Sequence, residues 1–107
     1  LVVSDYGSKD SLENIFSKNK IDAVLHFAAL TNVGESVEKP NLYYENNVTK
    51  SLILFDTMSR FGVDKLIYSS SAAIFGNPTQ PKINENHPTN PINPYGKTKL
   101  AVEQALK

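Results

Sequence analysis

Apolar and polar positions divide the first third of the chain into three segments. Residues 1–3 are all apolar and predict the end of a buried strand. A helix is predicted next, with Asp10 as its capping residue and its end at residues 19–20, because apolar residues recur there at helical spacing. Residues 21–29 are nearly continuously apolar, which is typical of a strand that is covered on both faces in a parallel sheet.

The middle of the chain repeats this succession of helix and strand. Residues 31–39 are polar and predict a loop. Apolar residues then keep a helical period over residues 40–60, where the opening proline suits a first helical turn. Gly62 suits the C-terminal cap of that helix. The largely apolar start of residues 65–71 predicts another strand.

Proline marks the last connection in the chain. Residues 76–94 contain five of the six prolines and predict a long irregular loop, and loops of this length usually carry function. Residues 95–107 predict a helix for which the sequence holds no stop signal, and the chain opens on apolar residues without a methionine. We therefore expect an interior piece of a longer protein.

The predicted order of elements, β-α-β-α-β-loop-α, defines the fold class. Strands that alternate with helices predict an α/β protein with a doubly wound parallel sheet, which would be incomplete in this chain. In such sheets, ligands bind beyond the carboxyl ends of the strands. Three strand ends are expected here, at residues 5–6, 27–29 and 69–71.

Composition excludes several classes of function. The 107 residues hold 11 Lys and Arg against 11 Asp and Glu, whereas nucleic-acid and anionic-membrane binders carry a surplus of positive charge. The absence of cysteine excludes disulfides, thiol catalysis and Cys-type zinc sites. No apolar run approaches the ~20 residues that a membrane helix needs, and the acidic residues show no metal-ligand spacing. We therefore expect a cytoplasmic globular protein with no metal, nucleic-acid or membrane partner.

Tyr95 and Lys99 carry the sharpest chemical signal. They stand four residues apart on a predicted helix, so both project from one face. A tyrosine hydroxyl ordinarily ionises only near pH ~10, and a neighbouring ammonium favours the phenolate, so the pair can take a proton from an alcohol. Ser71, at the end of a predicted strand, adds a hydroxyl that can position the substrate oxygen. For the pair by itself, a helix with a packed tyrosine and a solvated lysine is the alternative.

Five motifs, in order along the chain, resemble those of the extended short-chain dehydrogenase/reductases. They are HFAA (26–29), VGESVEKP (33–40), YYENNV (43–48), YSSSAAIFG (68–76) and NPYGKTKLAVEQ (93–104). The resemblance implies that residues 1–107 are part of a Rossmann-like NAD-binding domain. It also implies a glycine-rich N-terminal part and a C-terminal substrate domain outside this chain, so activity is expected of the complete protein and not of the fragment.

The motifs most resemble those of members that epimerise UDP-glucose and UDP-galactose at C4 through a transient 4-keto sugar, with bound NAD. The resemblance implies that Tyr95 takes the proton of the 4-hydroxyl, that Ser71 hydrogen-bonds the 4-oxygen, and that Lys99 contacts the nicotinamide ribose. Tyr95 and Ser71 are thus the expected contacts to the UDP-sugar. A homodimer, formed by the helices that match residues 41–60 and 95–107, is also implied.

The same resemblance implies a set of cofactor contacts. Asp5 and its follower match residues that hold the adenine, and the small Ala28 and Ala29 would let the backbone approach the pyrophosphate closely. Asn46 matches a helix asparagine whose amide faces the cofactor, and Asn47 is the less certain choice. The expected NAD contacts are Asp5, Tyr6, Phe27, Ala28, Ala29, Leu30, Thr31, Asn46, Ser69, Tyr95 and Lys99.

Other functions stay open at this point. A nucleotide-sugar dehydratase is disfavoured, because dehydration needs an added acid and base and no carboxylate follows Ser71. Epimerases that act on N-acetylated, pentose or uronic-acid sugars are not distinguished. A non-catalytic dinucleotide-binding module is a further alternative, although it would not need the Tyr95 and Lys99 pair. We interpret His26 as a satisfied core histidine and His87 as a solvated side chain.

Overall fold

A computed structural model describes residues 1–106 and has the α/β fold class that the sequence predicts. The elements are α1 (Lys9–Lys18), β1 (Val24–His26), α2 (Val33–Glu38), α3 (Pro40–Tyr43), the π-helical segment η1 (Tyr44–Thr49), α4 (Lys50–Arg60), β2 (Leu66–Tyr68), the 3₁₀ turn η2 (Ala72–Phe75) and α5 (Pro94–Ala105). The predicted final helix is therefore present, and its last residue lies outside the described part of the chain.

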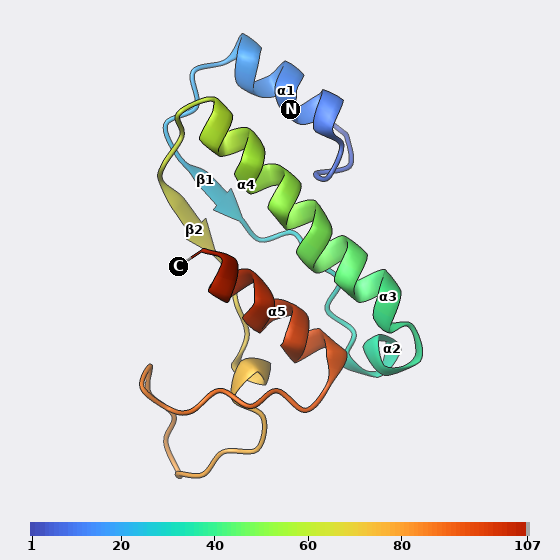
Figure 1. Cartoon of the computed structure of the whole chain (residues 1–107), viewed down its shortest axis with the longest axis vertical. Coiled ribbons are helices and arrows are strands. Elements are labelled where there is room, and N and C mark those ends of the chain that lie inside the picture. The colour runs from blue at the N-terminus through green and yellow to red at the C-terminus, as the bar shows by residue number, and fades with distance from the viewer. Residues whose placement is uncertain (107) are drawn as a thin grey trace.

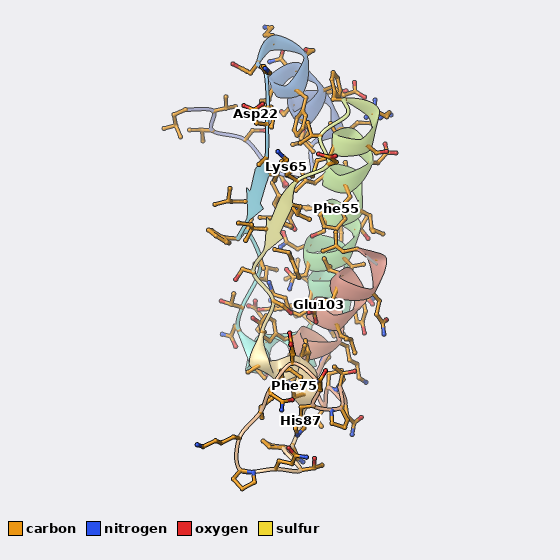
Figure 2. The ribbon with its side chains drawn as sticks, turned by 90° about the vertical axis from the view of Figure 1, so that its left-hand side faces the viewer. Asp22, Phe55, Lys65, Phe75, His87 and Glu103 are labelled. Atoms are coloured by element: carbon orange, nitrogen blue, oxygen red, sulfur yellow. The ribbon has the colours of Figure 1, made fainter. Side chains whose placement is uncertain are left out.

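The two strands form a parallel pair with helices on one side (Figure 2). Their register places His26 opposite Tyr68 and Leu25 opposite Ile67. The side chains of Leu25 and Ile67 point to the other side, where they are 61% and 60% exposed. The predicted parallel sheet is thus confirmed, although residues 1–3 form no strand, because a strand needs a ladder partner and their backbone has none in residues 1–106.

An apolar cluster joins α1, α4 and the strands (Figure 1). The core is where α1 lies against α4, and an exposed ion pair of 2.8 Å between Arg60 and Glu13 closes the edge of that contact. The α1–α4 layer therefore packs against one face of the strand pair. The buried members of the cluster are Leu12, Phe16, Leu54, Met58 and Val63.

Two local predictions are wrong, one about a helix cap and one about a loop. Ser8, and not Asp10, caps α1, since the Ser8 hydroxyl accepts the Ser11 N–H at 3.4 Å. The predicted polar loop at residues 31–39 contains the short helix α2, which Asn32 caps by accepting the Glu35 N–H at 2.9 Å. In both places a small polar side chain satisfies an amide that the first helical turn leaves free, and this local bond outweighs the lack of an apolar pattern.

The predicted helix over residues 40–60 is continuous but not uniform. It begins at Pro40 as α3, widens into η1 and continues as α4, and Gly62 follows it with a φ of +70°. Two carbonyls of η1 accept hydrogen bonds from side chains: the Tyr6 hydroxyl donates to the carbonyl of Asn46, and the Ser51 hydroxyl donates to that of Asn47 at 2.7 Å.

Candidate active site

His26 is the buried centre of the strand ends. It is 4% exposed, and the rings of Tyr6, Tyr68 and Phe55 surround it at centroid distances of 5.1, 5.5 and 6.1 Å. Because Ser51 gives its proton to the carbonyl of Asn47, its oxygen accepts the His26 Nε2 proton at 2.8 Å. Burial, and then the charge of Lys99, lower the pKa of His26. The interpretation of His26 as a satisfied core histidine is confirmed.

Helix α5 holds the segment that follows β2 at two points. The Lys99 Nζ donates to the carbonyl of Ser69 at 2.9 Å. One turn earlier, Gly96 lies so close to this segment that a Cβ at that position would be 2.6 Å from the carbonyl oxygen of Ala73. Ser71 stands between these two contacts. The fold therefore brings the segment that carries Ser71 against the first turns of the helix that carries Tyr95 and Lys99.

The serines after β2 leave hydrogen-bonding capacity unused. Ser71 caps η2, where its hydroxyl oxygen accepts the Ala73 N–H at 3.1 Å, so its own proton stays available to a ligand. The Ser70 hydroxyl is buried and has no partner in residues 1–106. Buried polar atoms are nearly always paired in proteins. A ligand or water that brings further polar atoms therefore fits this edge of the site.

Lys99 is a buried ammonium with spare donors. It is 3% exposed and lies 5.1 Å from the ring centroid of Tyr68, and burial lowers the pKa of its ammonium. The bond to Ser69 uses one of the three N–H groups. The two remaining donors suit a ligand with several hydroxyl groups, such as a ribose.

Tyr95 lies in the first turn of α5, which a helix cap, a proline and a hydrogen bond to α2 fix. Asn93 caps the helix by accepting the Gly96 N–H at 2.8 Å, and Pro94 occupies the first helical position. The Tyr95 amide donates to the hydroxyl of Ser36 on α2 at 3.1 Å. Tyr95 itself is 9% exposed. Sequence reasoning missed Ser36, since nothing in its local pattern predicts a partner 59 residues away.

Asn47 connects three parts of the site. From the sequence, its neighbour Asn46 is instead expected to be the asparagine that faces the cofactor. Its side-chain oxygen accepts the Leu30 N–H at 2.9 Å and its amide nitrogen donates to the Leu30 carbonyl at 3.0 Å. The same nitrogen lies 3.3 Å from the Thr98 hydroxyl, which donates to the Tyr95 carbonyl at 2.7 Å. Asn47 thus ties the segment after β1 to α5. Its amide is 2% exposed, whereas Asn46 is half-buried.

The other expected cofactor residues lie beside the carboxyl ends of the strands. Phe27 is 64% exposed, Ala28 and Thr31 are exposed, and Ala29 and Leu30 are half-buried. Asp5 is exposed, and the adjoining Tyr6 reaches this edge by stacking on His26. The structure therefore gathers segments 5–6, 27–31 and 69–71 around the end of β1 and the start of α5.

His87 is not solvated, and here the sequence interpretation is wrong. It is 5% exposed, its Nε2 accepts the Thr79 N–H at 3.1 Å, and its Nδ1 donates to the carbonyl of Pro88 at 2.9 Å. The ring also packs edge-on against Phe75 at 5.4 Å (Figure 2). In a loop without strands or helices, one side chain that bridges two backbone segments replaces the missing ladder.

We expect His87→Ala to loosen the proline-rich loop without unfolding the domain. The change leaves the Thr79 N–H without its acceptor, which costs about 1–3 kcal/mol of local stability. Limited proteolysis should then cut the loop faster within residues 77–90, while the thermal midpoint of the full-length protein changes little. Glu85→Ala, an exposed position in the same loop, is the control. Equal cleavage of His87→Ala and Glu85→Ala would contradict this role.

The profile of the NAD dependent epimerase/dehydratase family matches residues 1–107. The chain belongs to this family. It is 52% identical over 103 residues to UDP-glucose 4-epimerase 2 of Oryza sativa and 44% identical over 104 residues to UDP-glucose 4-epimerase of Bacillus subtilis. These matches take in 96% and 97% of this chain and 25% and 31% of the relatives, so the chain spans under a third of their length.

Solved structures of the epimerase/dehydratase family have the same fold. UDP-glucose 4-epimerase from Bifidobacterium longum, in complex with NAD⁺ and UDP, superposes with a TM-score of 0.95 at 44% identity over 98% of this chain and 32% of that one. The enzyme from Brucella ovis, in complex with NAD, gives a TM-score of 0.95 at 43% identity, again over 98% of this chain and 32% of that one. The predicted Rossmann-like fold is thus confirmed.

Two absences hold for residues 1–106 alone. No helix in that range combines the length and apolarity that crossing a membrane requires. No cluster of three or more His, Cys, Asp or Glu side chains there is arranged to ligate a metal ion. The cytoplasmic location stays a prediction.

Proposed function

We propose that the full-length protein interconverts UDP-glucose and UDP-galactose by inverting C4, with NAD as its resident cofactor. The observation that carries the proposal is the contact of α5 with the segment after β2. Lys99 bonds to Ser69 and Gly96 packs against Ala73, so Ser71, Tyr95 and Lys99 belong to one local unit. Relatives that are 44–52% identical are named UDP-glucose 4-epimerases, which supports the substrate.

The residues at the strand ends fit a dinucleotide. Backbone groups of segment 27–31 follow β1 without large polar side chains, which leaves room for a pyrophosphate to approach. The unpartnered Ser70 hydroxyl and the spare donors of Lys99 meet the need of a ribose for several hydrogen bonds. Asp5 and Tyr6 would hold the adenine end, and Asn46 and Ser69 would line the space between. When bound there, NAD would supply the acceptor and donor of hydride that the inversion needs.

Proton movement is the part that this chain supplies. Tyr95 would take the proton of the sugar 4-hydroxyl as the carbonyl forms, and would return it after the ketone has turned over. Ser71 would donate its free hydroxyl proton to the 4-oxygen and so fix that oxygen beside Tyr95. The Lys99 ammonium, buried and held by Ser69, lies one helical turn after Tyr95 on α5 and would contact the nicotinamide ribose.

An assay of the full-length protein with UDP-galactose tests the proposal. We expect UDP-glucose to appear without net consumption of NAD, because the hydride that leaves C4 returns to the same carbon. Incubation in deuterated water should leave C4 protiated, since only the hydroxyl proton exchanges. Formation of a dehydrated sugar, or an absence of turnover although NAD is bound, would overturn the epimerase proposal. The second outcome would favour a non-catalytic dinucleotide-binding module.

We also propose that the full-length protein forms a homodimer in which the helices over residues 41–60 and 95–107 pack across a two-fold axis. Tyr44 and Leu52 are 39% and 45% exposed and lie about two turns apart on η1 and α4. Apolar side chains spaced along one long helix are the usual content of a helix-pairing surface. Val48 and Phe55, which the sequence did not assign to a face, are half-buried.

A further inference from the structure

The turn at residues 5–7 is closed by its own side chain. The Asp5 Oδ1 accepts the Gly7 N–H at 2.8 Å, and the Asp5 carbonyl accepts the Ser8 N–H at 3.0 Å. An aspartate that bonds to the backbone two residues later forms an Asx turn. The conformation of this turn is therefore set locally, but nothing in it determines where the turn lies on the domain.

Lys50, which lies 45 residues away at the start of α4, fixes that place. Its Nζ donates to the Asp5 Oδ2 at 2.7 Å. Its aliphatic stem lies across Gly7, where any Cβ would overlap three carbons of the Lys50 side chain. The ion pair lowers the pKa of Asp5 and raises that of Lys50. Charge and shape thus hold the turn against the same side chain.

Tyr6 anchors the other side of the turn. Its hydroxyl donates to the carbonyl of Asn46 in η1, and its ring packs on His26 at a centroid distance of 5.1 Å. The turn is consequently held between the end of β1 and the junction of η1 with α4. Asn46 itself, one of the expected cofactor contacts, lies in η1.

Asp5 nevertheless keeps the capacity to bind a ligand. A carboxylate offers about four acceptor positions, and the bonds to Lys50 and Gly7 use one on each oxygen. The Asp5 side chain is 53% exposed, while that of Lys50 is only 24% exposed. An arriving amino group can therefore reach Asp5 without displacing Lys50. The Lys50 ammonium instead fixes the direction in which the carboxylate presents its remaining lone pairs.

We propose that Lys50 is a positioning residue for the cofactor, because it holds the Asp5–Gly7 turn where the turn receives the adenine end of the dinucleotide. This inference rests on the proposed function, in which Asp5 and Tyr6 hold the adenine. Lys50 touches neither the reacting atoms nor the segment with Ser71. Its effect is therefore on binding of the adenine half and not on the chemical step.

The test compares Lys50→Met and Lys50→Arg in the full-length protein after removal of bound cofactor. Methionine keeps an unbranched apolar stem and removes the charge. We expect Lys50→Met to bind NAD and AMP about threefold more weakly, as for the loss of a partly exposed ion pair, and to bind nicotinamide mononucleotide as the wild type does. Lys50→Arg should restore most of the affinity, and kcat at saturating NAD should not change.

Arg60→Met is the matched control. Arg60 also forms ion pairs from α4, with Glu13 at 2.8 Å and Asp56 at 3.1 Å, but at the opposite end of the helix. The Arg60→Met protein should bind AMP with the affinity of the wild type. Added KCl should weaken AMP binding by the wild type more than by Lys50→Met, because salt screens the exposed pair.

The outcomes separate this inference from the proposed function. Unchanged AMP affinity in Lys50→Met overturns the role of Lys50, and so does an equal loss of affinity for AMP and for nicotinamide mononucleotide. In either case, NAD binding by the wild type still upholds the cofactor proposal. A wild-type protein that binds no NAD overturns both. Selective loss for AMP, restored in Lys50→Arg and absent in Arg60→Met, supports it.

Discussion

Replacing Tyr95 with phenylalanine is expected to lower kcat of the full-length protein about 10²–10⁴-fold, the range that removal of a general acid–base group produces. The phenol oxygen is the only atom lost, and the ring keeps its packing in the first turn of α5. The contacts that place this turn involve the Tyr95 amide and carbonyl and are unaffected. NAD should therefore stay bound while turnover stops.

Single-turnover rates with UDP-galactose, together with the NAD content of the purified protein, measure this effect. Tyr43→Phe is the control, because Tyr43 is fully buried and its hydroxyl is already engaged, accepting from the Asn32 amide and donating to Glu35. That change should cost stability and leave kcat within a small factor of the wild type. A Tyr95→Phe protein that keeps a tenth or more of its kcat would refute the role of the phenol.

The second large effect is expected on stability, from Asn47→Leu. Leucine has a similar size but cannot bond to either backbone group of Leu30 or to the Thr98 hydroxyl. Unpaired buried polar groups cost about 1–3 kcal/mol each, so we expect a loss of about 2–4 kcal/mol in the free energy of unfolding. The segment after β1 should also lose its place relative to α5, so NAD should bind more weakly.

Urea unfolding of the full-length protein, in the presence and absence of NAD, checks this prediction. Asn46→Ala is the neighbouring control: Asn46 is half-buried, and within residues 1–106 its amide donates to the oxygen of Asn47 alone, at 3.0 Å. It should change the free energy of unfolding by under about 1 kcal/mol, the net worth of an ordinary hydrogen bond. Equal destabilisation by the two changes would contradict the role of Asn47 as the bridge between the segment after β1 and α5.

The Asn46 and Asn47 pair shows what a local sequence pattern can predict and what it cannot. Both lie on a helix that the sequence predicts correctly, and either could face a polar site. A uniform α-helix would place them about 100° apart around the axis, but η1 widens the helix at this point. Which amide enters the interior depends on this widening, and the widened turn also receives the Tyr6 hydroxyl, 40 residues away, on its Asn46 carbonyl.

His87 shows the same limit for a loop. Its neighbours are polar residues and prolines, which locally favour exposure. The structure buries it because Thr79 and Pro88 converge on its two ring nitrogens and the Phe75 ring packs against it at a right angle. Such convergence depends on how the loop closes, and closure is directed by Asn90, whose N–H donates to the Ile74 carbonyl at 3.0 Å.

The sequence by itself determined the alternation of strands and helices, the parallel sheet, and the placement of Tyr95 and Lys99 on one helix, because periodicity and spacing along a chain are local properties. Only the tertiary structure decided that Lys99 reaches Ser69, that Asn47 bridges Leu30 and Thr98, and that Lys50 holds Asp5. Each of these bonds joins residues 17 to 51 positions apart. Hydrogen bonds of that span form only after packing brings the elements together, so no local pattern encodes them.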